Sequence, residues 1–268
     1  MNTSILRRFF RITAATGFLG LALTTVGCAD MMADTRASRA SGIKLYNDGQ
    51  YADAAGAFRN TIRVAPFDYG SHYWLGASLE HLGSYEQAIS EYKTTLSIMS
   101  QSLEGKEDKQ FRLKVVDSLA SAIVKDQQGR DSEIAAIAKA PASAENQFVL
   151  AKIGRRSGDA DAALEAYSRA SLMAPKDFPI AKEFGIYLDQ LGQTDRARKE
   201  LRRAYALNSH DEEVAAALRH VGVVPGPSLK DESDMAQPLV PVGPIPELQL
   251  GQPQPKPDDN GQRTATTP

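Results

Sequence analysis

Cysteine is almost absent from this sequence, and its positive and negative charges nearly cancel. The 268 residues include one cysteine, Cys28, so a disulfide within the chain and a zinc site with several thiolate ligands are both excluded. The formal net charge is −2. Nucleic-acid binding requires a strongly basic surface, so we expect no nucleic-acid partner.

Clusters of metal-binding or catalytic side chains are also lacking. No two of the four histidines are separated by four residues, and no group of carboxylates accompanies them. Metal-binding helices need such spacing, and the sequence contains no glycine-rich loop of the kind that holds phosphate groups. We therefore expect no metal, no cofactor and no catalytic residues, and we interpret the chain as a protein that is not an enzyme.

One uncharged, mostly apolar run lies near the N-terminus. It is the 16-residue stretch ITAATGFLGLALTTVG, which follows a segment containing Arg7, Arg8 and Arg11 and no acidic residue. A membrane-spanning helix needs about 20 apolar residues, so this run is short for a span and fits the apolar region of a secretion signal. We therefore interpret residues 1–27 as a signal peptide.

Cys28 follows this run directly, in the sequence Thr-Val-Gly-Cys. The stretch resembles the bacterial lipobox, in which a cysteine is acylated after the signal is removed, although Thr25 stands where leucine is usual. An ordinary signal followed by a chance cysteine is the alternative. The resemblance implies lipidation of Cys28 and a tether over residues 28–34. Because Ala29 rather than aspartate follows the cysteine, the resemblance also implies that the protein faces the periplasm from the outer membrane rather than the inner one.

A sequence period of 34 residues runs through the rest of the chain. Units starting at residues 35, 69, 144 and 178 place glycine at position 15, small residues at positions 8 and 20, and a bulky residue at position 24. The residues are Gly49, Gly83, Gly158 and Gly192 at position 15; Gly42, Gly76, Ala151 and Gly185 at position 8; Ala54, Ala88, Ala163 and Ala197 at position 20; and Phe58, Tyr92, Tyr167 and Leu201 at position 24.

An antiparallel pair of helices explains these constraints. Glycine at position 15 can take the left-handed conformation that ends a helix. Positions 8 and 20 stay small where the two helices cross, because a larger side chain there would cost about 1–3 kcal/mol. One pair cannot bury its own apolar stripe, so successive pairs must stack.

This pattern resembles the tetratricopeptide repeat, and the resemblance covers half of the chain. It implies an all-α superhelical solenoid over residues 35–222. The four matching units are 35–68, 69–102, 144–177 and 178–211.

Two segments of the predicted solenoid do not match the pattern. We interpret residues 103–143 as a degenerate fifth repeat, with an amphipathic helix that ends at Gly129; a linker between two blocks of two repeats is the alternative. Residues 212–222 are expected to form a capping helix. About three stacked repeats are needed for stability, which favours one continuous stack of five.

The composition changes at Val223. Ten of the 14 prolines lie between Pro225 and Pro268, and aromatic residues are scarce there. Such a segment cannot bury enough apolar surface to fold, so we expect residues 223–268 to form a disordered, proline-rich tail. The apolar stretch PLVPVGPIPELQL within it is either a short motif for a partner or part of a solvated tail.

The resemblance further implies a binding surface. In tetratricopeptide proteins, positions 2, 5, 9, 12 and 13 of the first helices line a concave groove that binds protein segments. Carried over, these positions predict aromatic rings in the first half and a basic cluster in the second. The basic cluster suits an acidic segment or a carboxylate tail, with a solvated face as the alternative. The predicted groove residues are Arg39, Tyr46, Asn47, Tyr73, Glu80, His81, Phe148, Lys152, Arg155, Arg156, Lys182, Asp189 and Gln190.

These features together predict a membrane-anchored scaffold or adaptor that binds peptide or helical segments of bacterial envelope proteins. The layout is similar to that of the tetratricopeptide lipoproteins of pilus assembly and secretin piloting. The alternative is an envelope hydrolase, or a regulator of one, that uses the repeats to recruit its substrate.

The lipidation hypothesis is tested by the substitution Cys28→Ser. We expect the variant to move from the membrane fraction to the soluble fraction, because the acyl chains would supply the anchor at about 0.8 kcal/mol per buried methylene. Far-UV circular dichroism should show unchanged helix content. A variant that stays with the membranes would contradict lipidation at this residue.

Overall fold

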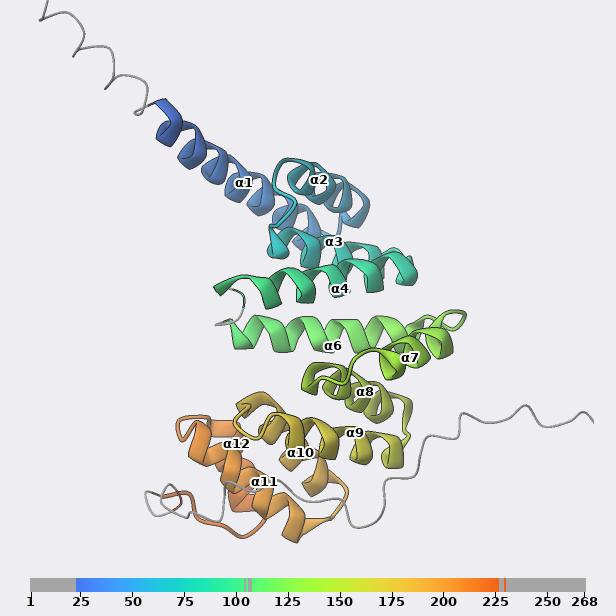
Figure 1. The fold of residues 1–268 in the computed structure, drawn as a ribbon, viewed down its shortest axis with the longest axis vertical. Helices are drawn as coiled ribbons and strands as arrows, with labels where there is room; N and C mark the ends of the chain where they lie inside the picture. The colour runs from blue at the N-terminus through green and yellow to red at the C-terminus, as the bar shows by residue number, and fades with distance from the viewer. Residues whose placement is uncertain (1–22, 104, 106–107, 227–228, 230–268) are drawn as a thin grey trace, which may run out of the picture.

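The computed structural model describes residues 23–103, 105, 108–226 and 229 (Figure 1). Most of the predicted signal peptide and most of the predicted tail therefore lie outside the described residues. Within them the secondary structure is helical, in eleven α-helices. The helices are α1 (Leu23–Asn47), α2 (Tyr51–Val64), α3 (Tyr69–His81), α4 (Tyr85–Gln101), α6 (Lys109–Lys125), α7 (Arg130–Lys139), α8 (Ala144–Ser157), α9 (Ala160–Met173), α10 (Phe178–Gln190), α11 (Thr194–Leu207) and α12 (Glu212–His220).

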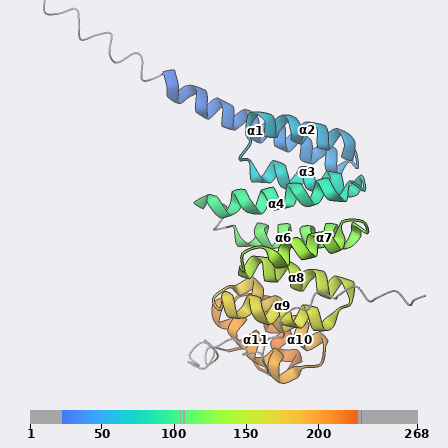
Figure 2. The same cartoon turned by 45° about the vertical axis from the view of Figure 1, so that its right-hand side comes forward.

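The helices stack along one axis, from α1 at one end to α11 and α12 at the other (Figure 1). A view turned by 45° shows the same order (Figure 2). Two helices joined by a short turn make one repeat, and the first helices of the repeats are α1, α3, α6, α8 and α10. The predicted all-α solenoid is confirmed.

Helix α1 is longer than a repeat helix. It begins at Leu23 and continues without a break through Cys28 and residues 28–34, the predicted tether, to Asn47. The sequence placed the first repeat helix from Thr35 onward. None of the described helices is both long and apolar enough to span a membrane. Signal cleavage and acylation at Cys28 stay predictions.

Glycines end the first helices of four repeats in the predicted conformation. The φ angles of Gly49, Gly83, Gly158 and Gly192 are 78°, 75°, 76° and 70°. After each of them, the next amide closes the helix end; for example, the N–H of Gln50 donates to the carbonyl of residue 45 at 2.9 Å. Side chains with a Cβ rarely adopt this backbone conformation, so these glycines fix the sharp turn into each second helix.

The degenerate repeat uses a different turn. Helix α6 ends at Lys125, and Gly129 has φ −95° and precedes the first residue of α7. The prediction that Gly129 stops this helix is therefore wrong. Asp126 ends the helix instead, because its carboxylate accepts the N–H groups of Gln128 and Gly129 and so holds a wider turn.

The repeat hairpins close around side chains at position 24. A Cβ added to Gly42 would lie 2.6 Å from Cε1 of Phe58, and one added to Gly76 would lie 2.8 Å from Cε1 of Tyr92. Both rings are fully buried. Position 8 must therefore be small so that the ring of the second helix can lie against the backbone of the first.

In the unit 144–177 a different pair of residues brings the two helices equally close. A Cβ on Gly154 would lie 2.8 Å from the amide nitrogen and 3.0 Å from the Cα of Ala163, which is fully buried. The two helix backbones are thus in direct contact at position 20. No space remains there for a larger side chain.

Substituting Ala163→Phe should therefore overpack this crossing. We expect a loss of about 1–3 kcal/mol in the free energy of unfolding, measured by thermal or denaturant unfolding. Ala162→Phe is the matched control, because Ala162 is the exposed neighbour on the same helix. Equal stability of the two variants would contradict the assigned repeat register.

A buried histidine of α3 joins the two helices of the second repeat to the α2–α3 turn that ends the first repeat. Nδ1 of His72 lies 2.6 Å from Oε2 of Glu91, and Nε2 lies 3.0 Å from the Pro66 carbonyl. Both partners are acceptors, so both ring nitrogens donate when the ring is an imidazolium. Burial disfavours that charge, but the hydrogen bonds to Glu91 and Pro66 outweigh burial and raise the pKa of His72 above 6.5.

Stability should depend on pH through His72. A raised folded-state pKa means that its contribution is complete below about pH 6.5 and is lost as the pH rises through the folded-state value. The wild type should exceed His72→Gln by about 1–3 kcal/mol at low pH and by less at high pH, measured by denaturant unfolding. The exposed His210→Gln serves as control. A stability difference between the wild type and His72→Gln that stays constant from low to high pH would contradict the imidazolium assignment.

Candidate protein-binding groove

The predicted groove contains a hollow of about 410 Å³ in the second half of the stack. Side chains of three successive first helices, α6, α8 and α10, line it together with one residue of α12. The hollow therefore runs along the repeats rather than within one of them. Its lining residues are Asp117, Lys152, Arg155, Arg156, Glu183, Ile186, Gln190 and Glu213.

The predicted basic cluster is brought together here, but carboxylates pair with it. Nζ of Lys152 lies 3.2 Å from Asp117 and 3.1 Å from Glu183. Arg155 contacts Glu183 at 3.1 Å, and Arg156 contacts Asp117 at 2.6 Å. Three cations thus face two carboxylates. The cluster is a salt-bridge network, and Glu213 adds a third carboxylate to the lining of the same hollow, so the charges of the hollow balance. The basic residues that the sequence predicted are therefore not a purely basic patch.

Sequence reasoning missed both carboxylates of this network. Glu183 occupies position 6 of its unit, next to the position assigned to the groove. Asp117 lies on the degenerate repeat, where the 34-residue period gives no register. Lys152 is 6% exposed between them, so it has a structural role in joining α6, α8 and α10.

Lys182, at the C-terminal end of the groove, links α10 to α12. Its Nζ lies 2.9 Å from Asp211 and 2.7 Å from Glu213. Burial favours the neutral amine, but hydrogen bonds to both carboxylates outweigh it and raise the pKa of Lys182. Burial likewise opposes the charge of Asp211, yet the hydrogen bonds from Lys182 and from the Val214 amide lower its pKa. The pair is therefore charged and fixed in place.

The remaining predicted polar residues of this half also have partners. Asp189 lies 2.8 Å from Nδ1 of His220, and Gln190 accepts a hydrogen bond from Arg155 at 2.9 Å. Phe148 is buried, and its ring packs edge-on against Tyr167. Phe148 therefore belongs to the core.

Aromatic rings of α1, α2 and α3 gather in the first half of the stack. Tyr46 packs edge-on against Trp74 at a centroid distance of 5.0 Å, and His81 stacks on Tyr51 at 4.1 Å. Nζ of Lys114 lies 4.8 Å from the Trp74 ring centroid, within the range of a cation–π contact. Burial, with smaller effects from neighbouring rings and a carboxylate, raises the pKa of Tyr46.

The other predicted residues of the first half differ in exposure. Asn47 is exposed, whereas Tyr73 is 4% exposed and packs against Phe111. Arg39 pairs with Asp68. The main role of Tyr73 and Arg39 is therefore in the contacts between repeats.

Glu80 is the acceptor at the centre of a polar network. The Tyr92 hydroxyl donates to it at 2.8 Å, Ser121 at 3.0 Å and Lys125 at 2.9 Å. These partners come from α4 and α6, so the carboxylate holds the second repeat to the degenerate one. Tyr92 is fully buried, and burial followed by the nearby Glu80 charge raises its pKa strongly.

A second hollow, of about 600 Å³, lies at the N-terminal end of the groove. It is formed by α1, the turn between α2 and α3, and the starts of α3 and α6. We call it the aromatic cleft. Its apolar side chains include Ile43, Val64, Pro66, Phe67, Tyr69, Trp74 and Phe111.

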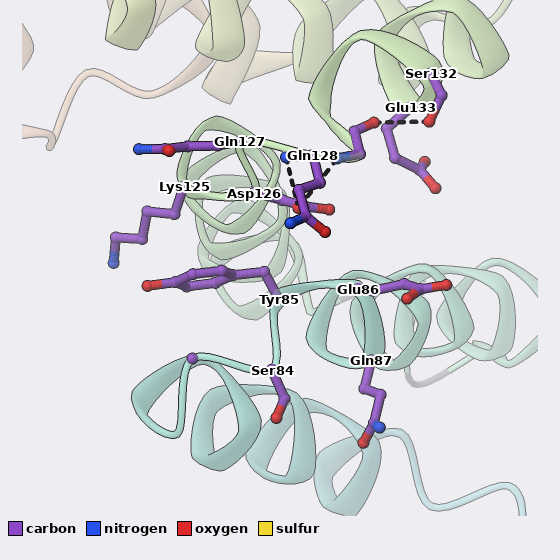
Figure 3. Close-up of a pocket in the computed structure, with 12 residues that line it drawn as sticks. Ser84, Tyr85, Glu86, Gln87, Lys125, Asp126, Gln127, Gln128, Ser132 and Glu133 are labelled. Atoms are coloured by element: carbon purple, nitrogen blue, oxygen red, sulfur yellow. Dashed lines mark hydrogen bonds between the residues drawn. The ribbon is translucent and has the colours of Figure 1, made fainter.

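A larger hollow, of about 840 Å³, lies where the α3–α4 turn faces the α6–α7 turn (Figure 3). The residues that line it include neither histidine nor cysteine. Asp126 accepts turn amides, and the Ser132 hydroxyl donates to the Gly129 carbonyl at 2.8 Å. These polar groups are thus hydrogen-bonded within the α6–α7 turn. Across the described residues, no group of three or more histidine, cysteine or acidic residues could hold a metal ion.

Comparisons with known proteins agree with the fold. The family model described as tetratricopeptide repeat matches residues 39–98, which lie in α1 to α4. A comparison with curated proteins finds no match.

Solved structures provide several distant likenesses. A thermophilic tetratricopeptide protein of Thermus thermophilus is 22% identical, with 70% of this chain and 80% of that chain covered and a TM-score of 0.35. YrrB, a tetratricopeptide protein with an unusual peptide-binding site, is 14% identical over 66% and 88%, with a TM-score of 0.37. PilF of Pseudomonas aeruginosa is 12% identical over 77% and 89%, with a TM-score of 0.33.

The repeat assignment therefore depends on the family match and on the contacts inside this chain. The matched segment contains the hairpins closed by Phe58 and Tyr92. The later hairpins repeat the left-handed glycine and the buried alanine at the same positions. Residues 39–98 therefore match the tetratricopeptide repeat, and the later hairpins continue the same helical stack.

Proposed function

We propose that this protein is a scaffold that binds extended or helical segments of other proteins in the groove of its first helices. The observation that carries the proposal is the hollow lined by α6, α8, α10 and α12. A surface that crosses several repeats fits a ligand lying along the stack, and stacked repeats are known for such extended binding surfaces.

The exposed arginines of the hollow favour a ligand that carries acidic side chains. Arg155 and Arg156 remain 29% and 36% exposed, and each guanidinium group contacts a single carboxylate of the network. An acidic side chain of a bound segment could displace Asp117 or Glu183 from one of these guanidinium groups. Arg is suited to this exchange, because its planar fork binds carboxylates through two donors.

We further propose that the scaffold is anchored by a lipid on Cys28 and faces the bacterial periplasm, from the outer membrane rather than the inner one. The support is the signal-like run before Cys28 and the alanine that follows it. Pilus, secretion or outer-membrane assembly is the context we propose, and catalysis is not part of the proposed role. An envelope hydrolase would instead show activity of the purified chain on peptide, ester or glycan substrates.

Affinity capture from native envelopes with the tagged full-length chain tests this function. We expect recovery of a secretin, pilus or outer-membrane assembly component, and about fivefold less of it with the double variant Arg155→Glu/Arg156→Glu. A fivefold loss corresponds to about 1 kcal/mol of binding free energy. Lys152 is left unchanged because it is buried between two carboxylates.

Arg59→Glu is the matched control, because Arg59 is an exposed arginine on the second helix α2. It should capture as much partner as the wild type. Equal capture by the double variant and the control, with unchanged unfolding temperatures, would refute the groove. Recovery of no envelope assembly component by the wild type would refute the proposed context.

A further inference from the structure

Large apolar side chains are exposed at the rim of the aromatic cleft. At its rim, Phe67 is 79% exposed and Val64 is 55% exposed. Trp74 and Phe111 form its floor together with Tyr69, whose ring is 5.6 Å from that of Phe111. Exposed apolar patches that line a cleft mark places where another segment docks. Aromatic clefts in particular accept proline-rich segments, whose extended form loses little entropy on binding.

The chain itself carries a segment of this kind. Residues 238–250, PLVPVGPIPELQL, contain four prolines interleaved with leucine, valine and isoleucine. One residue in the segment is charged, Glu247. Docking therefore buries apolar side chains at the cost of a single charge.

The charged side chains at the cleft rim are compatible with a segment that contains one acidic residue. The two acids there are engaged: Asp68 pairs with Arg39, and Asp108 accepts the Phe111 amide at 3.0 Å. Arg36 lines the cleft and is exposed. It is thus a suitable partner for Glu247.

The segment is long enough to reach the cleft. The last described helix, α12, lies at the end of the stack opposite to α1 (Figure 1), and Leu229, the last described residue, follows it in the sequence. Packed helices lie about 8–10 Å apart, so the four steps from α12 through α10, α8 and α6 to α3 cover roughly 32–40 Å. An extended proline-rich chain covers about 3.1 Å per residue, so Pro238 can lie about 28 Å and Leu250 about 65 Å from Leu229, and the C-terminal half of the segment reaches the cleft.

We propose that the aromatic cleft is the docking site for residues 238–250 of the same chain. The inference builds on the proposed function, because the cleft is the N-terminal end of the groove. A docked tail runs along the groove to reach it, so the tail and a protein partner compete. Binding of the partner then releases the tail.

The single tryptophan of the chain makes the test specific, because Trp74 lies in the cleft. Acrylamide quenching of its fluorescence is measured in the full-length protein. The patch variant carries Pro238→Ser, Pro241→Ser, Pro244→Ser and Pro246→Ser. We expect its quenching constant to be about twofold higher than that of the wild type, since Trp74 loses its cover. A synthetic peptide of residues 237–250 added to the variant should restore the wild-type value.

The matched control removes four prolines outside the segment, by Pro253→Ser, Pro255→Ser, Pro257→Ser and Pro268→Ser. It should quench like the wild type. Equal quenching of the patch variant and the wild type would overturn the proposal. So would wild-type shielding that disappears on dilution, because the tail would then come from a second copy. Partner capture that depends on Arg155 and Arg156 is a separate readout, so failure of the tail proposal leaves the proposed function standing.

Discussion

The solenoid depends on the absence of side-chain volume where the two helices of a repeat cross. Phe58 and Tyr92 can fill their hairpins because Gly42 and Gly76 leave room for the rings. Protein interiors are packed so densely that one added methylene is felt, and here the added atom would lie within 3 Å of a neighbour. The angle between the two helices, and through it the face on which the groove forms, follows from this contact.

Salt bridges hold consecutive elements of the stack together. Arg39 and Lys182 occupy the same position in two different units, and each pairs with the aspartate that closes its unit. Those aspartates, Asp68 and Asp211, also accept the first free amides of the following helix. One carboxylate thus caps a helix and fixes the preceding repeat against it. The groove is therefore lined by side chains that are already committed to the stack, and a ligand must exchange contacts rather than fill free ones.

The 34-residue period was sufficient to predict the hairpins and their left-handed glycines, because these depend on contacts inside one unit. The contacts between units were harder to predict. The pairing of Lys152 with Asp117 depends on the offset between α6 and α8, and the period is broken at α6. The turn at Gly129 was misjudged for the same reason, since Asp126 replaces the glycine as the group that ends the helix. Burial was also hard to predict: the sequence assigned Tyr73 to the groove, whereas the structure places it in the core.

The degenerate repeat has a mechanical consequence. Helix α7 has 10 residues and buries Ile137 alone, whereas α9 has 14 residues and buries six. In a stack where each repeat touches its neighbours, cohesion is a sum of local interfaces. A load pulling the two ends apart would therefore pass through α6, which packs directly against α4 and α8, and α7 could fray without parting the stack. Both arms would stay joined while this one short helix opens.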